Sequence, residues 1–247
     1  MRVAIIAALS GELKPLVRYE GWERMPVAVG SGLSMWRKLR GGDEWIAVCG
    51  GMGAAAARRA FAAAEFLGTL DLVLTVGWAG ALTSESAPSR CFMVTEVIDA
   101  QTGERFPLGS AQPPVRLVTC VRVADGAEKR RLASTYGAVL VDMEAAAVAR
   151  LSQMRGIPVR CFKAVSDGLQ ADLPDLNPFI DVAGRLRLTF FLAHLALRPR
   201  YWVGMLQLAG NSRRAALALA QAIETFLCDS GSEQDQTMRM DGEYEGE

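Results

Sequence analysis

The sequence predicts an α/β fold, built as one domain around a central sheet flanked by helices. Short apolar runs rich in β-branched residues, which are typical of buried strands, alternate with alanine-rich stretches of helical character. Glycines or carboxylates stand at several of the changes from strand to helix, where such folds place their ligands. The 247 residues are enough for one large domain with a full core.

The first half of the chain supplies most of the expected strands. Residues 2–8 form an apolar run that leads through a small-residue turn into a short helix. A glycine cluster at 50–53 separates the strand expected at 45–49 from an alanine-rich helix at 54–67. The other strands of this half are expected at 27–30, 71–76, 92–98 and 115–123.

The second half alternates in the same way. A helix over 125–136 opens with Asp125 and Glu128, which have the spacing of a capping box. The apolar run 139–142 changes into an alanine-rich helix, and the run 162–167 ends in a glycine turn. Later helices are expected over 186–197 and from a cap at Asn211 or Ser212 to about Leu227.

Carboxylates mark the exits of two successive strands. Asp142 and Glu144 flank Met143 where the first of these strands becomes a helix, and Asp167 stands at the exit of the second. Ligands of open α/β sheets bind beyond the carboxyl ends of the strands, so Glu144 and Asp167 are expected on opposite sides of one substrate. A structural alternative is that Asp142 caps the helix and Glu144 favours its positive end.

Two motifs at these exits resemble those of a known family. Residues 141–147 read VDMEAAA and resemble the ribose-binding V-[ED]-M-E-x-A-A signature of the nucleoside phosphorylase / methylthioadenosine nucleosidase superfamily. Residues 164–167 read AVSD and resemble its purine-side [AV]-[IV]-S-D motif, in the family's order and at about its spacing. The resemblance covers residues 2–197. It implies a mixed central sheet and cleavage of the N-glycosidic bond of a purine nucleoside.

The resemblance implies a role for each matching side chain. Asp167 would protonate or hydrogen-bond the leaving purine, and Ser166 would orient it. Glu144 would hold the ribose hydroxyls while Met143 packs against the sugar. Glu12 matches the glutamate that activates water in the hydrolytic branch of the family. The alternative for Glu12 is a first-turn glutamate favoured by the helix dipole.

Two small-residue turns are expected to form a pocket for the nucleophile. Backbone N–H groups at such turns approach anions, and a helix N-terminus adds partial positive charge. By resemblance the pocket takes phosphate or the attacking water. Trp78 stands where relatives carry small or hydroxylated residues. The identity of the nucleophile, phosphate or water, therefore stays open. The pocket residues are Gly51, Gly53, Gly77, Trp78 and Ala79.

On the base side, relatives bracket the purine with the strand before the signature. Val121 and Val123 are the corresponding residues, and we expect backbone and apolar contacts from them because no aromatic residue is present in that run.

Composition excludes several classes of function. The charge balances at +0, so nothing points to nucleic acid. The five cysteines are odd in number and widely spaced, and the single histidine, His194, lies in an apolar run. We therefore expect reduced thiols, no metal and no organic cofactor, with phosphate as a possible co-substrate. Because the chain opens directly into a strand, a cytoplasmic location is expected.

The C-terminal part of the chain has an unusual distribution of charge. Residues 182–223 contain six arginines and no acidic residue, around an apolar run too short to span a bilayer. Segment 185–214 is therefore a candidate for peripheral contact with the inner face of a membrane, with a locally packed cap and solvated arginines as the alternative. The predicted units are a catalytic domain at 1–197, a basic amphipathic helical extension at 198–228 and an acidic disordered tail at 229–247.

Within the superfamily, the extension and the compact signature most resemble the hopanoid-associated phosphorylase branch. That branch implies adenine release from adenosylhopane, a lipid-linked nucleoside, by phosphorolysis or hydrolysis. A soluble nucleosidase for methylthioadenosine and adenosylhomocysteine is one alternative. A non-catalytic nucleoside-binding protein is another, although the intact Glu144 and Asp167 argue against it. Relatives also imply a homo-oligomer, most simply a homodimer.

Overall fold

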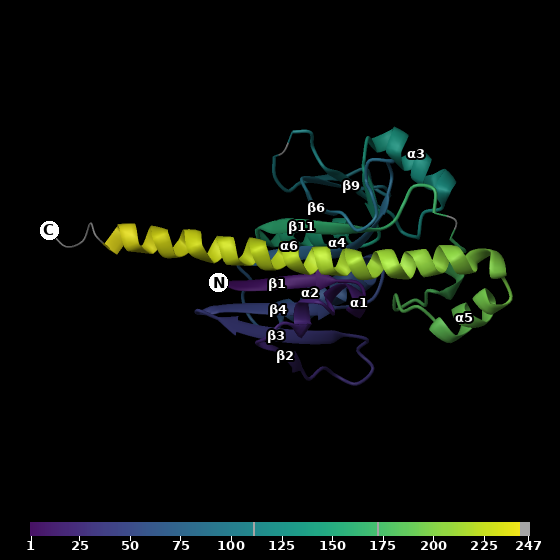
Figure 1. Cartoon of the computed structure of the whole chain (residues 1–247). Helices are drawn as coiled ribbons and strands as arrows, with labels where there is room; N and C mark the ends of the chain where they lie inside the picture. The colour runs from purple at the N-terminus through teal and green to yellow at the C-terminus, as the bar shows by residue number, and fades with distance from the viewer. Residues whose placement is uncertain (111, 172, 243–247) are drawn as a thin grey trace.

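The computed structural model has one mixed central sheet flanked by helices, as the sequence predicts (Figure 1). It describes residues 1–110, 112–171 and 173–242. The strands are β1 (Arg2–Ala7), β2 (Trp22–Met25), β3 (Ser34–Arg40), β4 (Asp43–Cys49), β5 (Leu72–Ala81), β6 (Cys91–Val94), β7 (Glu96–Asp99), β8 (Arg105–Pro107), β9 (Arg116–Thr119), β10 (Leu140–Asp142) and β11 (Val159–Asp167). The helices are α1 (Ser10–Leu13), α2 (Ala54–Glu65), α3 (Gly126–Tyr136), α4 (Ala145–Arg155), α5 (Leu188–Ala196) and α6 (Trp202–Gly242), with 3₁₀ turns η1 (Leu16–Arg18), η2 (Asn177–Phe179) and η3 (Pro199–Tyr201).

Strand β5 is the centre of the sheet. Its ten residues are almost all apolar or glycine, which suits a strand buried on both faces. It pairs in parallel with β1 and with β11, and its last residues pair antiparallel with β10. Strand β4 runs parallel to β1. The carboxyl ends of β4, β1, β5 and β11 therefore meet at one edge of the sheet.

Helices cover the two faces of the sheet, and alternate residues of β1 point to each. Val3 and Ile5 pack in a core cluster with residues of α6, whereas Ala4 and Ile6 pack in a second cluster with residues of α2 and α4. Figure 1 shows α6 as a long rod lying across the sheet. This alternation is what a strand buried on both faces requires.

The helix predicted as a C-terminal extension at 198–228 is present, but it is an integral part of the core rather than an addition to it. Helix α6 buries Ala215, Leu219, Ala220, Ile223 and Leu227 in the same cluster as residues of β1, β5 and β11. The helix begins at Trp202 rather than at a cap on Asn211 or Ser212. The segment 229–242, expected to be disordered, continues this helix, and residues 243–247 lie outside the described residues.

Three predicted strands also differ from the structure, and the one expected at 115–123 ends at Thr119 as β9. No strand forms at 27–30; the chain there connects β2 to β3 and contains Gly30, whose φ of 82° is unsuited to a strand. The run at 92–98 is divided into β6 and β7, which pair with different partners. The capping box is confirmed for its first residue, because the Asp125 side chain accepts the N–H groups of Ala127 and Glu128.

None of the five cysteines, all of which lie in the described part of the chain, forms a disulfide, and Cys49, Cys120 and Cys161 are buried. Among the described residues, no helix combines the length and the apolar character that crossing a bilayer requires.

A buried ion pair joins β11 to β10 beneath the edge where the strands end. The Nζ atom of Lys163 lies 2.8 Å from Oδ2 of Asp142, with side chains 1% and 0% exposed. Burial by itself would lower the pKa of the Lys163 ammonium, but the charge of Asp142 raises it above its ordinary value. Asp142 also accepts the Thr119 hydroxyl at 2.6 Å and the N–H of Ala145 at 2.9 Å. Asp142 is thus both counter-ion and cap of α4.

Replacing Lys163 is expected to destabilise the fold strongly. The change Lys163→Met should lower the free energy of unfolding by about 3–5 kcal/mol, because it leaves the Asp142 carboxylate buried without a counter-ion. Denaturant unfolding measures the loss. The control is Lys163→Met combined with Asp142→Asn, which removes the orphan charge and keeps an oxygen to cap α4. A double variant no more stable than the single one would contradict this account.

Candidate active site

Glu12 is held at the carboxyl end of β1 by backbone donors. It is 4% exposed and lies in α1. Its Oε2 accepts the N–H groups of Ala8 at 2.9 Å and Leu9 at 2.8 Å, and its Oε1 accepts the N–H of Trp78 at 2.8 Å. Burial raises the pKa of Glu12 above its usual range, and the three donors and the Lys163 charge oppose that rise without cancelling it.

Glycine is required next to this carboxylate. Gly77 in β5 has a φ of 150°, and a Cβ placed there would lie 2.8 Å from Oε1 of Glu12. A Cβ at Gly11 would lie 2.9 Å from the ring of Trp78. The two glycines therefore allow α1 and β5 to approach closely enough for Glu12 to reach the backbone of β5.

The glycine turn after β4 is closed by its own neighbours. The N–H groups of Gly50 and Gly51 donate to the carbonyls of Ala7 and Ala8, at the end of β1, at 3.2 and 2.9 Å. The N–H of Met52 donates to Gly184 at 2.7 Å, and that of Gly53 donates to Oε1 of Glu144 at 2.7 Å. All four N–H groups of the turn are thus in use, contrary to their expected role as free donors for an anion.

Glu144 lies at the N-terminus of α4 and faces this turn. Burial, reinforced by the neighbouring negative charge of Asp142, raises the pKa of Glu144 to about 7, against the opposing effects of Lys163 and the Gly53 N–H. Glu12 adds a smaller repulsion in the same direction. Met143, next to it, has its N–H 3.2 Å from Oε2 of Glu144. The structure thus brings Glu12, Gly53 and Glu144 together.

Asp167, at the exit of β11, accepts hydrogen bonds on both oxygens. The hydroxyl of Ser166 is 2.7 Å from Oδ1 and also lies 3.4 Å from the carbonyl of Ala79. The ammonium of Lys129, on α3, forms an ion pair with Oδ2 and donates to the carbonyl of Gly168 at 3.0 Å. Asp167 therefore has a positively charged partner in this state of the protein.

Lys129 was missed by sequence reasoning because it lies in the charged run EKRR, which is typical of a solvated helix face. It is only 4% exposed. A weak signal was present: Lys129 stands three residues before the buried Leu132 and so on the same face of α3.

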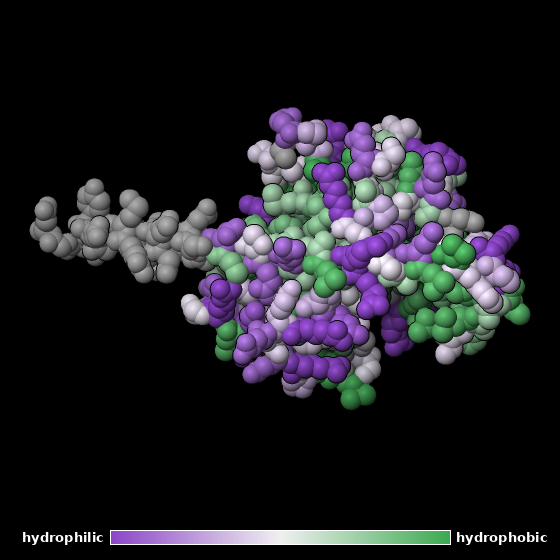
Figure 2. Space-filling view, in the orientation of Figure 1, coloured by the Kyte–Doolittle hydropathy of each residue, from purple (hydrophilic) through white to green (hydrophobic). Residues whose placement is uncertain are grey.

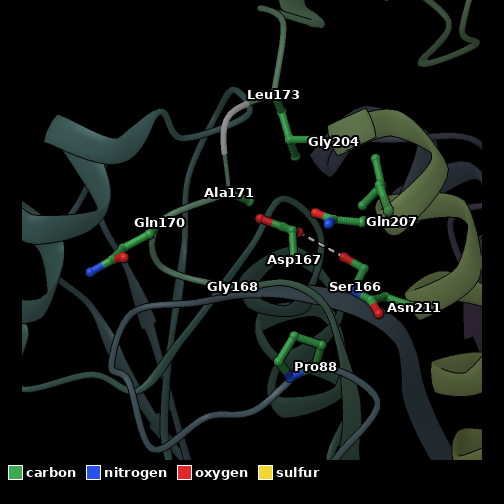
Figure 3. A pocket seen from close by; sticks show the side chains of 11 residues that line it. Pro88, Ser166, Asp167, Gly168, Gln170, Ala171, Leu173, Gly204, Gln207 and Asn211 are labelled. Atoms are coloured by element: carbon green, nitrogen blue, oxygen red, sulfur yellow. Dashed lines mark hydrogen bonds between the residues drawn. The ribbon is translucent and has the colours of Figure 1, made fainter. Parts of the chain in front are cut away.

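A cavity of about 270 Å³ opens beside Ser166 and Asp167 (Figure 3). One side is the loop that follows β11, and the opposite side is the start of α6, which carries Gly204 and Gln207. The sequence did not predict that α6 would form one wall of the cavity. The cavity lining does not include Glu12 or Glu144. The remaining lining residues are Pro88, Gly168, Gln170, Ala171, Leu173, Leu208 and Asn211.

The two valines predicted to contact the base lie apart from this cavity. Val121 is largely exposed. The N–H and carbonyl of Val123 both pair with the side chain of Asn177, at 2.9 and 3.1 Å. Their backbone groups are therefore less available to a base than the sequence suggested.

Residues 77–80 of β5 connect the two halves of the site. The N–H of Trp78 binds Glu12, whereas a Cβ at Gly80 would lie 3.1 Å from the Lys129 side chain and 3.2 Å from Asp167. One strand thus separates a carboxylate pair from an acid–ammonium pair. No group of residues suited to hold a metal ion occurs in the described part of the chain.

Comparison with known proteins identifies the family of the chain. The family model of the phosphorylase superfamily matches residues 2–127 and 117–191. A comparison with curated protein sequences gave no significant match.

Solved structures are similar over nearly the whole chain. The futalosine hydrolase and the 5′-methylthioadenosine/S-adenosylhomocysteine nucleosidase of Helicobacter pylori each share 14% identity with it, over 93% of this chain and 98% of theirs, with a TM-score of 0.69. The 5′-methylthioadenosine nucleosidase of Arabidopsis thaliana shares 18% identity over 92% of this chain and 94% of its own, with a TM-score of 0.71. At these identities the likeness is one of fold.

The change Gly77→Ala is expected to destabilise the protein more than a matched glycine change elsewhere. Backbone strain at a positive φ costs about 1–3 kcal/mol. Displacing Glu12 from the Trp78 N–H adds about 1–3 kcal/mol for an unpaired buried donor. Denaturant unfolding measures the sum. Gly103→Ala is the control, since Gly103 has a φ of 74° and open space around its Cβ. Equal losses in the two variants would show that Glu12 is not crowded.

Proposed function

The chain belongs to the phosphorylase superfamily, and we propose that it cleaves the N-glycosidic bond of an adenosine-type nucleoside by hydrolysis. The observation that carries this proposal is the placement of Glu12, Glu144 and Asp167 around the ends of β1, β10 and β11, bridged by residues 77–80 of β5. Binding a nucleoside would not require a carboxylate beside each of the sugar, the nucleophile and the base.

The chemistry follows from the charges that develop as the bond breaks. When the bond between C1′ and the purine nitrogen breaks, its electron pair moves onto the purine and the ribose gains oxocarbenium character. Glu144, as a carboxylate, accepts the ribose hydroxyls and stabilises that positive charge. Asp167 shares a proton with the ring nitrogen N7 of the leaving purine. The Lys129 ammonium, which contacts the same carboxylate, can replace that proton.

Water fits the nucleophile position better than phosphate does. The N–H groups of the glycine turn are already bound within the chain, and the N–H of Trp78 is bound to Glu12. The buried cation nearby, Lys163, is paired with Asp142. A phosphate dianion would therefore meet the charges of Glu12 and Glu144 at a turn whose N–H groups are already bound. Glu12 accepts a proton from water as the C1′–O bond forms.

For the 5′-substituent we propose the lipid-linked nucleoside adenosylhopane. The support is local: the α6 residues that line the cavity continue directly into large exposed apolar side chains, including Trp202, Val203 and Leu206. The second candidate is methylthioadenosine or adenosylhomocysteine, favoured by the match in fold to the nucleosidases of Arabidopsis thaliana and Helicobacter pylori.

We expect adenine release from adenosylhopane in detergent at a rate that does not depend on phosphate, with methylthioadenosine a poorer substrate. Chromatography measures adenine, and mass spectrometry tests the ribosyl product for phosphate. A phosphorylated ribosyl product would show that the reaction is phosphorolysis and not hydrolysis. Preference for methylthioadenosine would select the second candidate, and release from neither would leave a nucleoside-binding protein.

The change Asp167→Asn is expected to lower kcat by about 10²–10⁴-fold, because it removes the acid that serves the leaving base. The matched control is Glu23→Gln, which neutralises an exposed carboxylate on β2, at the far edge of the sheet. Single-turnover adenine release measures the chemical step. Full activity of the asparagine variant would remove Asp167 from the mechanism.

The pH dependence of kcat/KM should report Glu144. Because its pKa is raised to about 7, the carboxylate that accepts the ribose hydroxyls forms only as the pH rises through that value. We therefore expect kcat/KM to increase from acid pH towards a plateau above pH 7. In Glu144→Gln this limb should disappear from the residual activity. A limb that persists in the glutamine variant would assign it to another group.

A further inference from the structure

Helix α5 is apolar except at Thr189 and His194, yet little of it is buried against the fold. Of its nine residues, Phe191 is buried, and Leu188, Phe190 and Leu192 are exposed. A helix that is hydrophobic all round normally lies inside a protein or in contact with lipid. Figure 2 shows the result as a concentration of hydrophobic side chains over α5 and its surroundings.

The exposed apolar surface extends from α5 to the start of α6. We call it the apolar ridge, and its members are between 49% and 83% exposed. Such a patch on a protein surface marks an interaction site. The ridge consists of Phe190, Leu192, Leu197, Trp202, Val203 and Leu206.

Arginines surround the ridge without acidic counterparts. Arg187 lies over the ring of Phe190 at 4.5 Å, Arg198 directly precedes η3 and Arg200 lies within it. No carboxylate in the described part of the chain forms an ion pair with any of these three arginines. The sequence from Val182 to Ile223 contains no acidic residue at all. The surface is therefore both apolar and positively charged.

We propose that the apolar ridge docks on an anionic membrane surface. Leucine, valine and aromatic side chains enter the boundary between headgroups and acyl chains, and the three arginines bind lipid phosphates. A second copy of this chain fits less well, since a symmetric contact would bring the arginines of both copies together with no acidic residue between them.

The place of the ridge in the fold gives the docking a geometric consequence. Trp202, Val203 and Leu206 alternate along the first turns of α6 with Gly204 and Gln207, which line the cavity beside Asp167 (Figure 3). A membrane in contact with the ridge would lie next to the mouth of that cavity. The docking rests on the surface alone and not on the proposed reaction.

The test is flotation of the full chain with vesicles of phosphatidylcholine alone or with phosphatidylglycerol added. We expect binding to the anionic vesicles and little to the neutral ones. Arg198→Gln with Arg200→Gln should weaken that binding at least about tenfold. Leu197→Ser with Val203→Ser should weaken it similarly, because apolar insertion contributes alongside charge.

The matched controls change equally exposed residues elsewhere. They are Arg24→Gln with Arg58→Gln for charge and Phe66→Ser with Leu39→Ser for apolar surface, and both should bind like the unmodified chain. All variants are exposed, so folding should survive, and circular dichroism checks this. No binding to anionic vesicles, or equal loss in controls and ridge variants, would overturn the proposal. Ridge variants that dissociate a dimer in sedimentation without lipid would assign the ridge to a second copy.

Discussion

The ion pair between Lys163 and Asp142 is the interaction on which the site depends. Burial raises the pKa of two further carboxylates, Glu12 and Glu144, and the nearby charge of Lys163 opposes that rise in both. Without a cation beneath them, the concentration of negative charge at this edge of the sheet would be still less favourable. The same pair fixes β11 to β10, and Asp142 caps the helix that begins beside Glu144. The Lys163–Asp142 ion pair therefore helps both to position the carboxylates of the candidate site and to balance their charge.

The positions of Glu144 and Asp167 in the candidate site could be predicted because their signals are local. Glu144 and Asp167 stand at the ends of apolar runs, and a strand that ends at a sheet edge presents its next residues to a ligand. The parts that escaped prediction depend on tertiary packing. In the sequence Lys129 resembles its solvated arginine neighbours, and only the folded chain brings its ammonium to Asp167 at the end of β11. The start of α6 was placed too late because Asn211 and Ser212 have the character of caps, although packing makes them the interior of a longer helix.

The glycine turn after β4 shows how the same local pattern can serve two purposes. Glycines between a strand and a helix are suited to hold an anion, and here the turn does meet one, since the Gly53 N–H donates to the Glu144 carboxylate. Its other N–H groups donate to the carbonyls at the end of β1 and to that of Gly184. The turn thus positions a side chain of the protein where another protein would bind a free ion.

Different stretches of helix α6 make different kinds of contact. Its middle, from Ala215 to Leu227, is locked in the core, while its first turns carry one wall of the cavity and border the apolar surface. Access to the cavity and stability of the domain are therefore encoded in separate stretches of one continuous element. The stretch from Trp202 to Asn211 can diverge in sequence while the core contacts stay constant. Substitutions in the first turns of α6 would therefore reshape the cavity wall and leave the core contacts of the middle of the helix in place.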